Sequence, residues 1–194
     1  MAPTVTPTGT PTGTPTAPTL VAGTWEIDPV HSLVEFTARH LMVSKVRGRF
    51  TRFGGTVTVP DDPFASSVTA TIEIASVDTG SEDRDKHLRS PDFFDVDRFP
   101  TMEFASHSVR PEGDAYVLTG NLSLHGVTRA VDLHLELNGV SADPWGGTRV
   151  GFSATTELNR RDFGIDIKLP LDGGGVVVGD KVRVELEIQA VLAS

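Results

Sequence analysis

The feature that most constrains the fold is a strict alternation of apolar and polar side chains. The stretch AVDLHLELNG is the clearest example. One face of it carries Val131, Leu133, Leu135 and Leu137, and the other carries Asp132, His134 and Glu136. A period of two is typical of a β-strand with one buried and one solvated face. We therefore expect a sheet with a single apolar side.

Further segments repeat this period. The sets predicted to face inward are Val34, Phe36, Ala38 and His40; Val46, Gly48 and Phe50; Val68, Ala70, Ile72 and Ile74; Met102, Phe104 and Ser106; Tyr116, Leu118, Gly120, Leu122 and Leu124; Val150, Phe152, Ala154, Thr156 and Leu158; and Val182, Val184, Leu186 and Ile188. Turn signals separate them at Asp61-Asp62-Pro63, Pro111-Glu112-Gly113, His125-Gly126, Asn138-Gly139 and Gly173-Gly174-Gly175.

These segments predict an all-β domain over residues 23–194, with about eight or nine long antiparallel strands. Such strands close most simply into a barrel, because closure removes the exposed edges. Two packed sheets are the alternative. Residues 81–99 lack the strand period and contain helix formers, so a short helical insertion is expected there.

The inward faces mix small residues with phenylalanines, a lining that is compatible with an elongated cavity or with a filled core. Face alternation and position select these candidates for ligand contact: Val34, Phe36, Ala38, His40, Phe50, Phe94, Phe104, Phe152, Asn159 and Arg160. His40 has two interpretations, a buried histidine bonded to a structural partner or a polar contact at one end of a pocket. Arg160 likewise suits an anionic head group or an ion pair at the barrel rim.

Composition excludes several functions. The 17 basic and 26 acidic side chains give a formal net charge of -9, which argues against nucleic acid as a main partner. Lys45, Arg47, Arg49 and Arg52 form a local basic cluster, which we interpret as a solvated barrel exterior. The sequence contains no cysteine and therefore no disulfide or thiolate metal site.

The N-terminal residues 1–22 are rich in Pro, Thr and Gly and are predicted to form a disordered tail. They have neither the basic nor the apolar region of a secretory signal, so a cytoplasmic location is expected. No apolar run approaches the length of a membrane span.

Catalytic motifs are lacking. The histidines show no metal-pair spacing, and the sequence has no nucleophile elbow and no P-loop. We therefore expect no catalytic residue and no metal site. The stretch RDKHLRSPDFFDVDRFPTMEF, which holds His87, is interpreted as a lid or plug. Its anchors against one barrel end are Leu88, Phe93, Phe94 and Phe99, and Arg84 and His87 are expected to be structural.

Four motifs occur in order along the chain: GTWEIDPVHSLVEFTARHLMVSKVRGRFTRFGGTV, RDKHLRSPDFFDVDRFPTMEF, LTGNLSLHGVTRAVDL and LNRRDFGI. Each is weak alone, but the four in this order are specific. They cover Gly23 to about Ala190, and the chain resembles the YceI-like, or polyisoprenoid-binding, family.

The resemblance implies an eight-stranded, lipocalin-like extended barrel whose interior holds an isoprenoid or a similar amphipathic lipid. Family members are regarded as binding or carrier proteins, so no cofactor is expected beyond a bound polyisoprenoid or fatty-acid-like lipid. Transient membrane contact and a homodimer are further expectations. Many members carry a secretion signal and are periplasmic or extracellular, and this sequence departs from that pattern.

Two alternatives to a lipid carrier stay open. One is an enzyme that uses His40 or His87 with the Asp and Arg clusters. The other is a non-catalytic interaction module presented by the tail.

Overall fold

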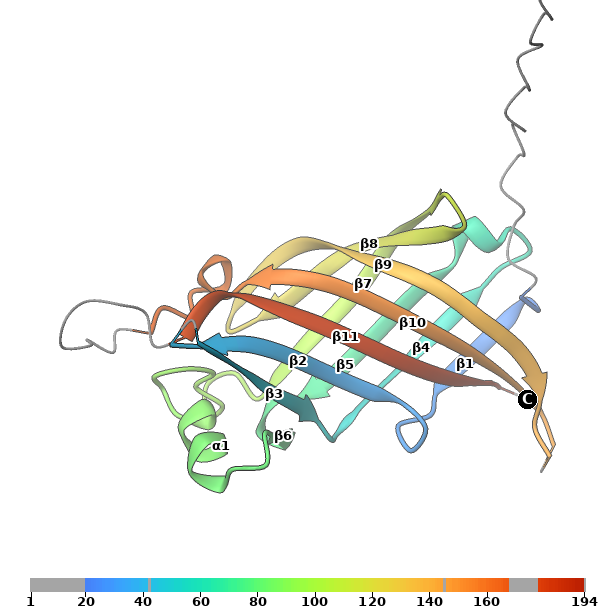
Figure 1. Cartoon of the computed structure of the whole chain (residues 1–194). Helices are drawn as coiled ribbons and strands as arrows, with labels where there is room; N and C mark the ends of the chain where they lie inside the picture. Colours follow the sequence, from blue (N-terminus) through green and yellow to red (C-terminus); the bar gives the residue numbers. More distant parts are fainter. Residues whose placement is uncertain (1–19, 42, 145, 168–177, 194) are drawn as a thin grey trace, which may run out of the picture.

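The computed structural model describes residues 20–41, 43–144, 146–167 and 178–193, which form one antiparallel sheet (Figure 1). Its strands are β1 (Gly23–Ile27), β2 (Leu33–His40), β3 (Ser44–Phe50), β4 (Phe53–Val59), β5 (Ser67–Glu73), β6 (Val77–Asp78), β7 (Thr101–Glu112), β8 (Ala115–Leu124), β9 (Val127–Ala142), β10 (Thr148–Asn159) and β11 (Val178–Leu192). Most of the predicted tail and the predicted turn at Gly173-Gly174-Gly175 lie outside the described residues.

The sheet closes on itself because β11 pairs with β10 on one side and with both β1 and β2 on the other. β1 and β2 lie end to end along β11, β3 and β4 lie end to end beside them, and β5 continues into β6. The segments therefore make eight full strands, which confirms the predicted all-β barrel.

The alternating pattern is seen directly in the barrel wall. Along β9 the exposed side chains of Asp132 and His134 alternate with the half-buried ones of Leu133 and Leu135. The inward residues keep some exposure because they border an internal space, which is described below. The alternation is therefore the sequence record of an inside and an outside.

One predicted turn is confirmed and another is wrong. His125 (φ 52°) and Gly126 (φ 74°) form the two-residue turn between β8 and β9. Asn138 and Gly139 do not end a strand, because β9 continues to Ala142. A bulge in the pairing of β9 with β10 accommodates Gly139 without breaking the sheet.

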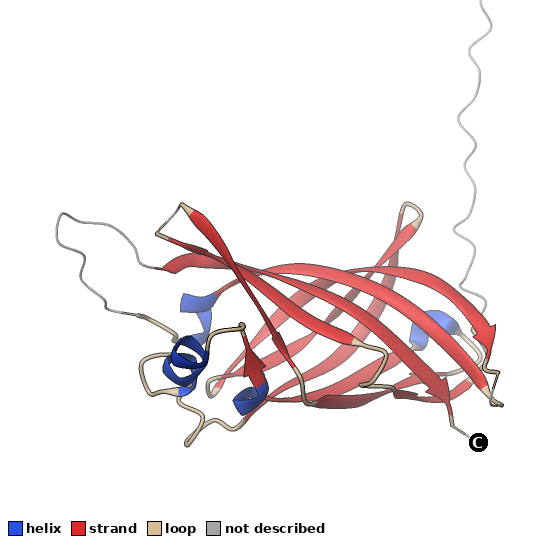
Figure 2. Cartoon of the chain, turned by 60° about the horizontal axis from the view of Figure 1, so that its bottom comes forward, coloured by secondary structure: helices blue, strands red, loops and turns tan. Residues whose placement is uncertain are grey.

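The predicted insertion between β6 and β7 contains helix α1 (Glu82–Arg89). It lies outside the barrel wall at the end that carries the β2–β3 hairpin, on the left in Figure 1, while the chain ends at the opposite side. Residues 91–94 and 96–98 form turns, so only the first part of the predicted insertion is helical. The remaining helices are one-turn 3-10 segments (Figure 2), η1 (Pro63–Ala65), η2 (Ile74–Ser76) and η3 (Arg160–Phe163).

Two apolar clusters pack the barrel. The larger one includes Ile74, Val77 and Phe163, all almost fully buried, together with residues of the α1 connection. The other surrounds Trp25, which is fully buried, with Val150 and Ala190 beside it. Dense packing thus stabilises two parts of the barrel, although the barrel interior is not filled along its whole length.

Candidate ligand-binding cavity

An internal cavity runs within the barrel and leaves room for the centres of water-sized molecules over about 220 Å³. One water molecule needs only about 10–15 Å³ on this measure, so the space is an order of magnitude larger. Every strand except β6 contributes to the wall. The space is therefore a property of the whole barrel and not a local packing defect.

The wall of the cavity is almost entirely hydrocarbon. Its polar or charged members are Glu35, Ser66, Tyr116 and Thr156. No His, Lys, Arg or Asp of the described chain lines it. Such a wall favours an apolar chain and offers few groups to hold a polar one.

The structure places five predicted contact residues on the wall: Val34, Phe36, Phe50, Phe104 and Phe152. The rings of Phe36 and Phe50 lie 5.6 Å apart. Glycines opposite the rings make room for them, because a Cβ on Gly120 would lie 2.5 Å from the Phe104 ring. The predicted role of these residues in ligand contact stays a prediction.

The predicted inward position of His40 is wrong. Its side chain is exposed at the end of β2, and neither His40 nor the half-buried Ala38 lines the cavity. The pairing of β11 with β2 shifts register between Val178 and Val182, and His40 pairs with Val178 beyond that shift. The alternation of side chains in β2 therefore continues as far as His40, although this end of the strand no longer borders the cavity.

Asn159 and Arg160 also lie off the wall. The Asn159 side chain accepts a hydrogen bond from the Arg161 amide at 3.1 Å and caps η3. Arg160 is buried, donates to the carbonyl oxygen of Ile165 at 2.6 Å and pairs with Asp180 at 2.7 Å. The guanidinium of Arg160 therefore bonds protein groups at the barrel rim. Of its two predicted interpretations, this agrees with the ion pair and not with binding of an anionic head group.

The remaining candidate, Phe94, covers the cavity wall from outside. It is half-buried in the connection after α1, and its ring meets that of Phe50 edge-on at 6.1 Å. Leu88 and Phe93 pack against the same cluster, and Phe99 stacks on His125 at 4.6 Å. The connection therefore covers this end of the barrel with apolar side chains.

Polar contacts fasten the same connection. Asp85 is buried and accepts hydrogen bonds from the amide (2.9 Å) and the hydroxyl (2.6 Å) of Thr79. Arg84 also bonds Thr79, and Arg89 donates to the carbonyl oxygens of Ala75 and Val77. These bonds hold the connection to residues 75–79, and its predicted role as a lid or plug stays a prediction.

His87 takes part in a local contact. Its Nε2 lies 3.3 Å from Asp92, and its ring packs on Phe93 at 4.9 Å. Among the described residues, no group of three or more His, Asp or Glu side chains is placed to hold a metal ion. Neither His40 nor His87 lines the cavity, so the two histidines do not form a site within it.

The predicted ligand contacts do not include the wall residues at the opposite end of the barrel. Leu20 belongs to the predicted tail, yet it lines the cavity and packs near Trp25. Pro63 of η1 and Tyr116 of β8 line the same end, and the rings of Phe64 and Tyr116 lie 6.4 Å apart. Tyr116 is predicted to face inward together with Leu118, and its place on the wall agrees with that prediction.

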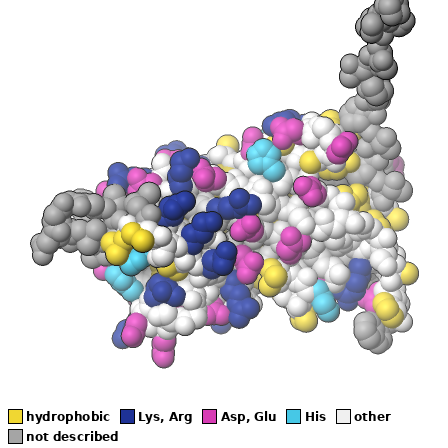
Figure 3. Space-filling model, viewed as in Figure 1, with side chains coloured by type: hydrophobic (Ala, Val, Ile, Leu, Met, Phe, Trp, Pro, Cys, Tyr) yellow, Lys and Arg dark blue, Asp and Glu magenta, His cyan; other side chains and the backbone are white. Residues whose placement is uncertain are grey.

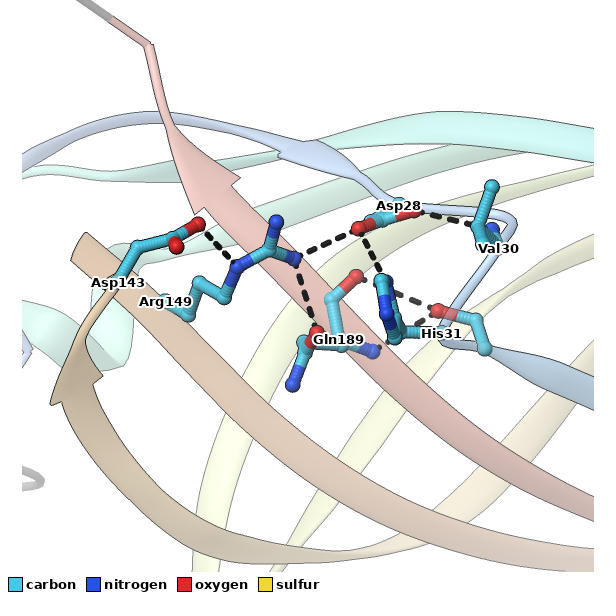
Figure 4. A network of polar contacts seen from close by, with 7 residues as sticks. Asp28, Val30, His31, Asp143, Arg149 and Gln189 are labelled. Carbon is cyan, nitrogen blue, oxygen red and sulfur yellow. Dashed lines mark hydrogen bonds and ion pairs between the residues drawn. The ribbon is translucent and has the colours of Figure 1, made fainter. Parts of the chain in front are cut away.

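A separate polar network lies near the ends of β1 and β10 (Figure 4). Arg149 donates to Asp28 (2.6 Å), Asp143 (2.5 Å) and the side-chain oxygen of Gln189 (2.9 Å). Asp28 also contacts His31 Nδ1 at 2.8 Å. The hydrogen bond from Arg149 holds the pKa of the Asp28 carboxyl well below its usual range. The network ties loops together and does not face the cavity.

The fold and the cavity define a class of protein: a closed antiparallel barrel with an apolar interior and a helical cover at one end. The family model described as the YceI-like domain matches residues 25–190, and the chain belongs to this family. No helix in the described part of the chain is long and apolar enough to cross a membrane.

Relatives agree with this assignment. The chain is 45% identical to the protein YceI of Salmonella newport over 152 residues, which is 77% of this chain and 80% of that protein. The crystal structure of BcnA from Burkholderia cenocepacia matches with a TM-score of 0.73 at 22% identity, over 84% and 98% of the two chains. A polyisoprenoid-binding domain from Saccharophagus degradans, implicated in plant cell wall breakdown, matches with a TM-score of 0.69 at 18% identity, over 87% and 98%.

Proposed function

We propose that this protein binds a long-chain isoprenoid or a similar amphipathic lipid inside the barrel and sequesters or carries it without catalysis. The observation that carries the proposal is the internal cavity with its hydrocarbon wall. The ligand named for the structurally similar polyisoprenoid-binding domain supports the same class of lipid.

The driving force is the burial of apolar carbon. Each buried CH₂-sized group contributes about 0.8 kcal/mol, so a five-carbon isoprene unit contributes about 4 kcal/mol before costs. Ordering of the chain and competition from the membrane reduce this gain, so the observed affinity is smaller. A polar head group would set orientation more than strength.

Catalysis has little support from the described structure. The wall offers no histidine and no basic group to act on a bound chain, and His40 and His87 lie elsewhere. The interaction-module hypothesis depends on the N-terminal tail, of which residues 1–19 lie outside the described residues. The cavity therefore favours a lipid carrier over both alternatives.

Native mass spectrometry of the purified protein, followed by lipid extraction, tests the proposal. We expect a mass increment that organic solvent removes and that chromatography identifies as a polyprenyl or other long-chain lipid. A protein that emerges without lipid and does not take up an added polyprenyl lipid would contradict the proposal.

Filling the cavity supplies a matched test. Ala154 lies on the wall and is only 5% exposed, so Ala154→Phe should occupy the ligand space and reduce bound lipid at least tenfold. Ala130→Phe adds the same ring to an exposed position of β9 and should leave lipid content unchanged. Equal lipid content in the two variants would show that the lipid does not bind in the cavity.

A further inference from the structure

The tip of the β2–β3 hairpin exposes apolar side chains to solvent. Leu41 is 42% exposed and Val43 is 85% exposed, beside the exposed side chain of His40. Adjacent exposed apolar side chains that form a patch, unlike single ones, are typical of contact sites.

The backbone at the tip adds a second observation. Leu41 has a φ of 50°, a conformation that suits glycine or asparagine better than a leucine. The amide of Val43 donates to the carbonyl oxygen of His40 at 3.0 Å and closes the turn. Stability alone would favour a small polar residue here, so an exposed leucine in this geometry indicates a functional requirement.

Basic side chains surround these apolar ones. Arg39 and Lys45 are register partners on the hairpin, and Arg47 lies one step further from the tip on the same outer face. All three are exposed, and none forms an ion pair with a described residue. Within the described part of the chain their positive charge is therefore uncompensated, in a protein whose formal net charge is -9.

Neighbouring basic residues differ in this respect. Arg49 pairs with Asp78 at 3.0 Å, Arg183 with Glu185 at 3.1 Å and Lys181 with Glu157 at 2.6 Å. Figure 3 shows the basic side chains gathered over β2, β3 and β11, next to hydrophobic side chains at the left end of this face. Basic side chains without an ion-pair partner among the described residues are thus concentrated close to the exposed apolar tip.

A second exposed valine shows that apolar exposure alone does not make such a site. Val30, in the loop between β1 and β2, is 82% exposed. Its charged neighbours Asp28 and His31 contact each other, and Arg149 pairs with Asp28. The β2–β3 tip differs from this loop because its exposed apolar side chains lie beside cations that have no ion-pair partner among the described residues.

We propose that this tip, defined as Arg39, His40, Leu41, Val43, Lys45 and Arg47, docks on the surface of an anionic phospholipid bilayer. Leu41 and Val43 enter the boundary between head groups and acyl chains, and the cations bind lipid phosphates. Nucleic acid would use the cations but not the apolar side chains, so the bilayer fits the tip better. Lys45 and Arg47, which were interpreted from the sequence as a solvated barrel exterior, would thus bind lipid phosphates.

Docking by the tip would bring the barrel to the membrane that supplies its lipid. This purpose rests on the proposed function, lipid binding in the cavity. The two strands that form the tip also carry Phe36 and Phe50, which line the cavity. Leu41 lies five residues from Phe36 along the chain, a strand distance of roughly 16 Å. A docked barrel would turn its α1 end, and not the end with the chain terminus, toward the lipid supply (Figure 1).

Vesicle partitioning of the full chain tests the docking. We expect binding to vesicles of equal parts phosphatidylglycerol and phosphatidylcholine, weak binding to phosphatidylcholine alone, and loss of binding at high salt. The triple variant Arg39→Gln, Lys45→Gln, Arg47→Gln should lower partitioning roughly 100-fold. Arg52→Gln, Arg98→Gln and Arg110→Gln together change the net charge equally and should leave most of the binding.

The apolar contribution has its own control. Leu41→Ser with Val43→Ser should reduce partitioning at least about tenfold, because two apolar side chains no longer enter the bilayer. Val30→Ser removes a valine of equal exposure elsewhere and should have no effect. Thermal unfolding followed by circular dichroism verifies that each variant is folded.

Wild-type protein that does not bind anionic vesicles, or tip variants that bind as tightly as their controls, would overturn the docking proposal. Native mass spectrometry of the same samples reports lipid content separately. An unloaded protein that takes up no added polyprenyl lipid but still binds vesicles through the tip would refute the proposed cargo and support docking. A lipid-loaded protein that ignores vesicles would refute docking alone.

Discussion

At the scale of single residues, Arg149 joins parts of the chain that lie far apart in the sequence. It connects its own strand β10 with Asp28 between β1 and β2, with Asp143 between β9 and β10, and with Gln189 on β11. Its side chain is 23% exposed, and that of Asp28 is 15% exposed. Solvent screens this pair less than the fully exposed pairs of the barrel surface.

Replacement of Arg149 should reveal the pH dependence of this network. Arg149→Gln should lower the melting temperature at neutral pH by a few degrees. The depressed pKa of Asp28 means that its contribution is present above the ordinary carboxyl pKa and is lost as the pH falls toward the folded value. Wild type should therefore lose more stability than the variant between about pH 4 and pH 2.

Thermal unfolding across this pH range provides the measurement. Arg110→Gln, which breaks an exposed pair with Glu112, is the control and should have almost no effect. Equal pH profiles for wild type and Arg149→Gln would show that the Asp28 pair contributes no stability.

At the scale of elements, the α1 connection is the part whose sequence most resembles an active site. Its charged residues bond Thr79 and the carbonyl oxygens of Ala75 and Val77, so their chemistry is structural. Its aromatic residues press on the barrel end. Density of charge in a sequence is therefore a poor guide to reactivity when the charges meet partners a few residues away.

Phe94→Ala tests this element as a plug. Removal of the half-buried ring that packs on Phe50 should cost about 2 kcal/mol of unfolding free energy and increase the rate of lipid loss. Denaturant unfolding and the release of a fluorescent polyprenyl analogue provide the measurements.

Phe93→Ala serves as the control for the same connection, because that ring packs edge-on against His87, whereas the Phe94 ring packs against Phe50 of the cavity wall. It should reduce stability without the same effect on lipid release. If Phe94→Ala changes neither stability nor lipid content, the connection does not plug the barrel.

At the scale of the whole molecule, stability and occupancy should be linked. The cavity interrupts the packing between the two apolar clusters, and a bound chain would restore the missing contacts. A ligand that binds only the folded state stabilises it in proportion to the logarithm of its concentration over the dissociation constant.

Removal of the lipid should therefore lower the melting temperature. At a free ligand concentration of about 100 times the dissociation constant, the expected difference is about 5–10 °C. Scanning calorimetry before and after solvent extraction, and after return of the lipid, measures it. Ala154→Phe should show no response to added lipid, and an equal response in that variant would contradict binding within the cavity.

Several features were determined by the sequence alone. Alternation predicts the strands and the inward position of Phe104 and Phe152, and His125 with Gly126 predicts the β8–β9 turn. These features depend on the chemistry of near neighbours, because the side-chain period of a strand and the φ preferences of a turn are local.

Only the tertiary structure decided where the barrel interior ends and whether it is filled. His40 continues the inward period of β2 but lies beyond a register shift. Asn138 and Gly139 do not end β9, because β9 bulges at Asn138 and its pairing with β10 continues on both sides. The cavity depends on residues far apart in the chain. So does the lack, among the described residues, of carboxylate partners for Arg39, Lys45 and Arg47. Local patterns specify faces and turns, whereas closure, register and charge pairing arise from contacts between distant strands.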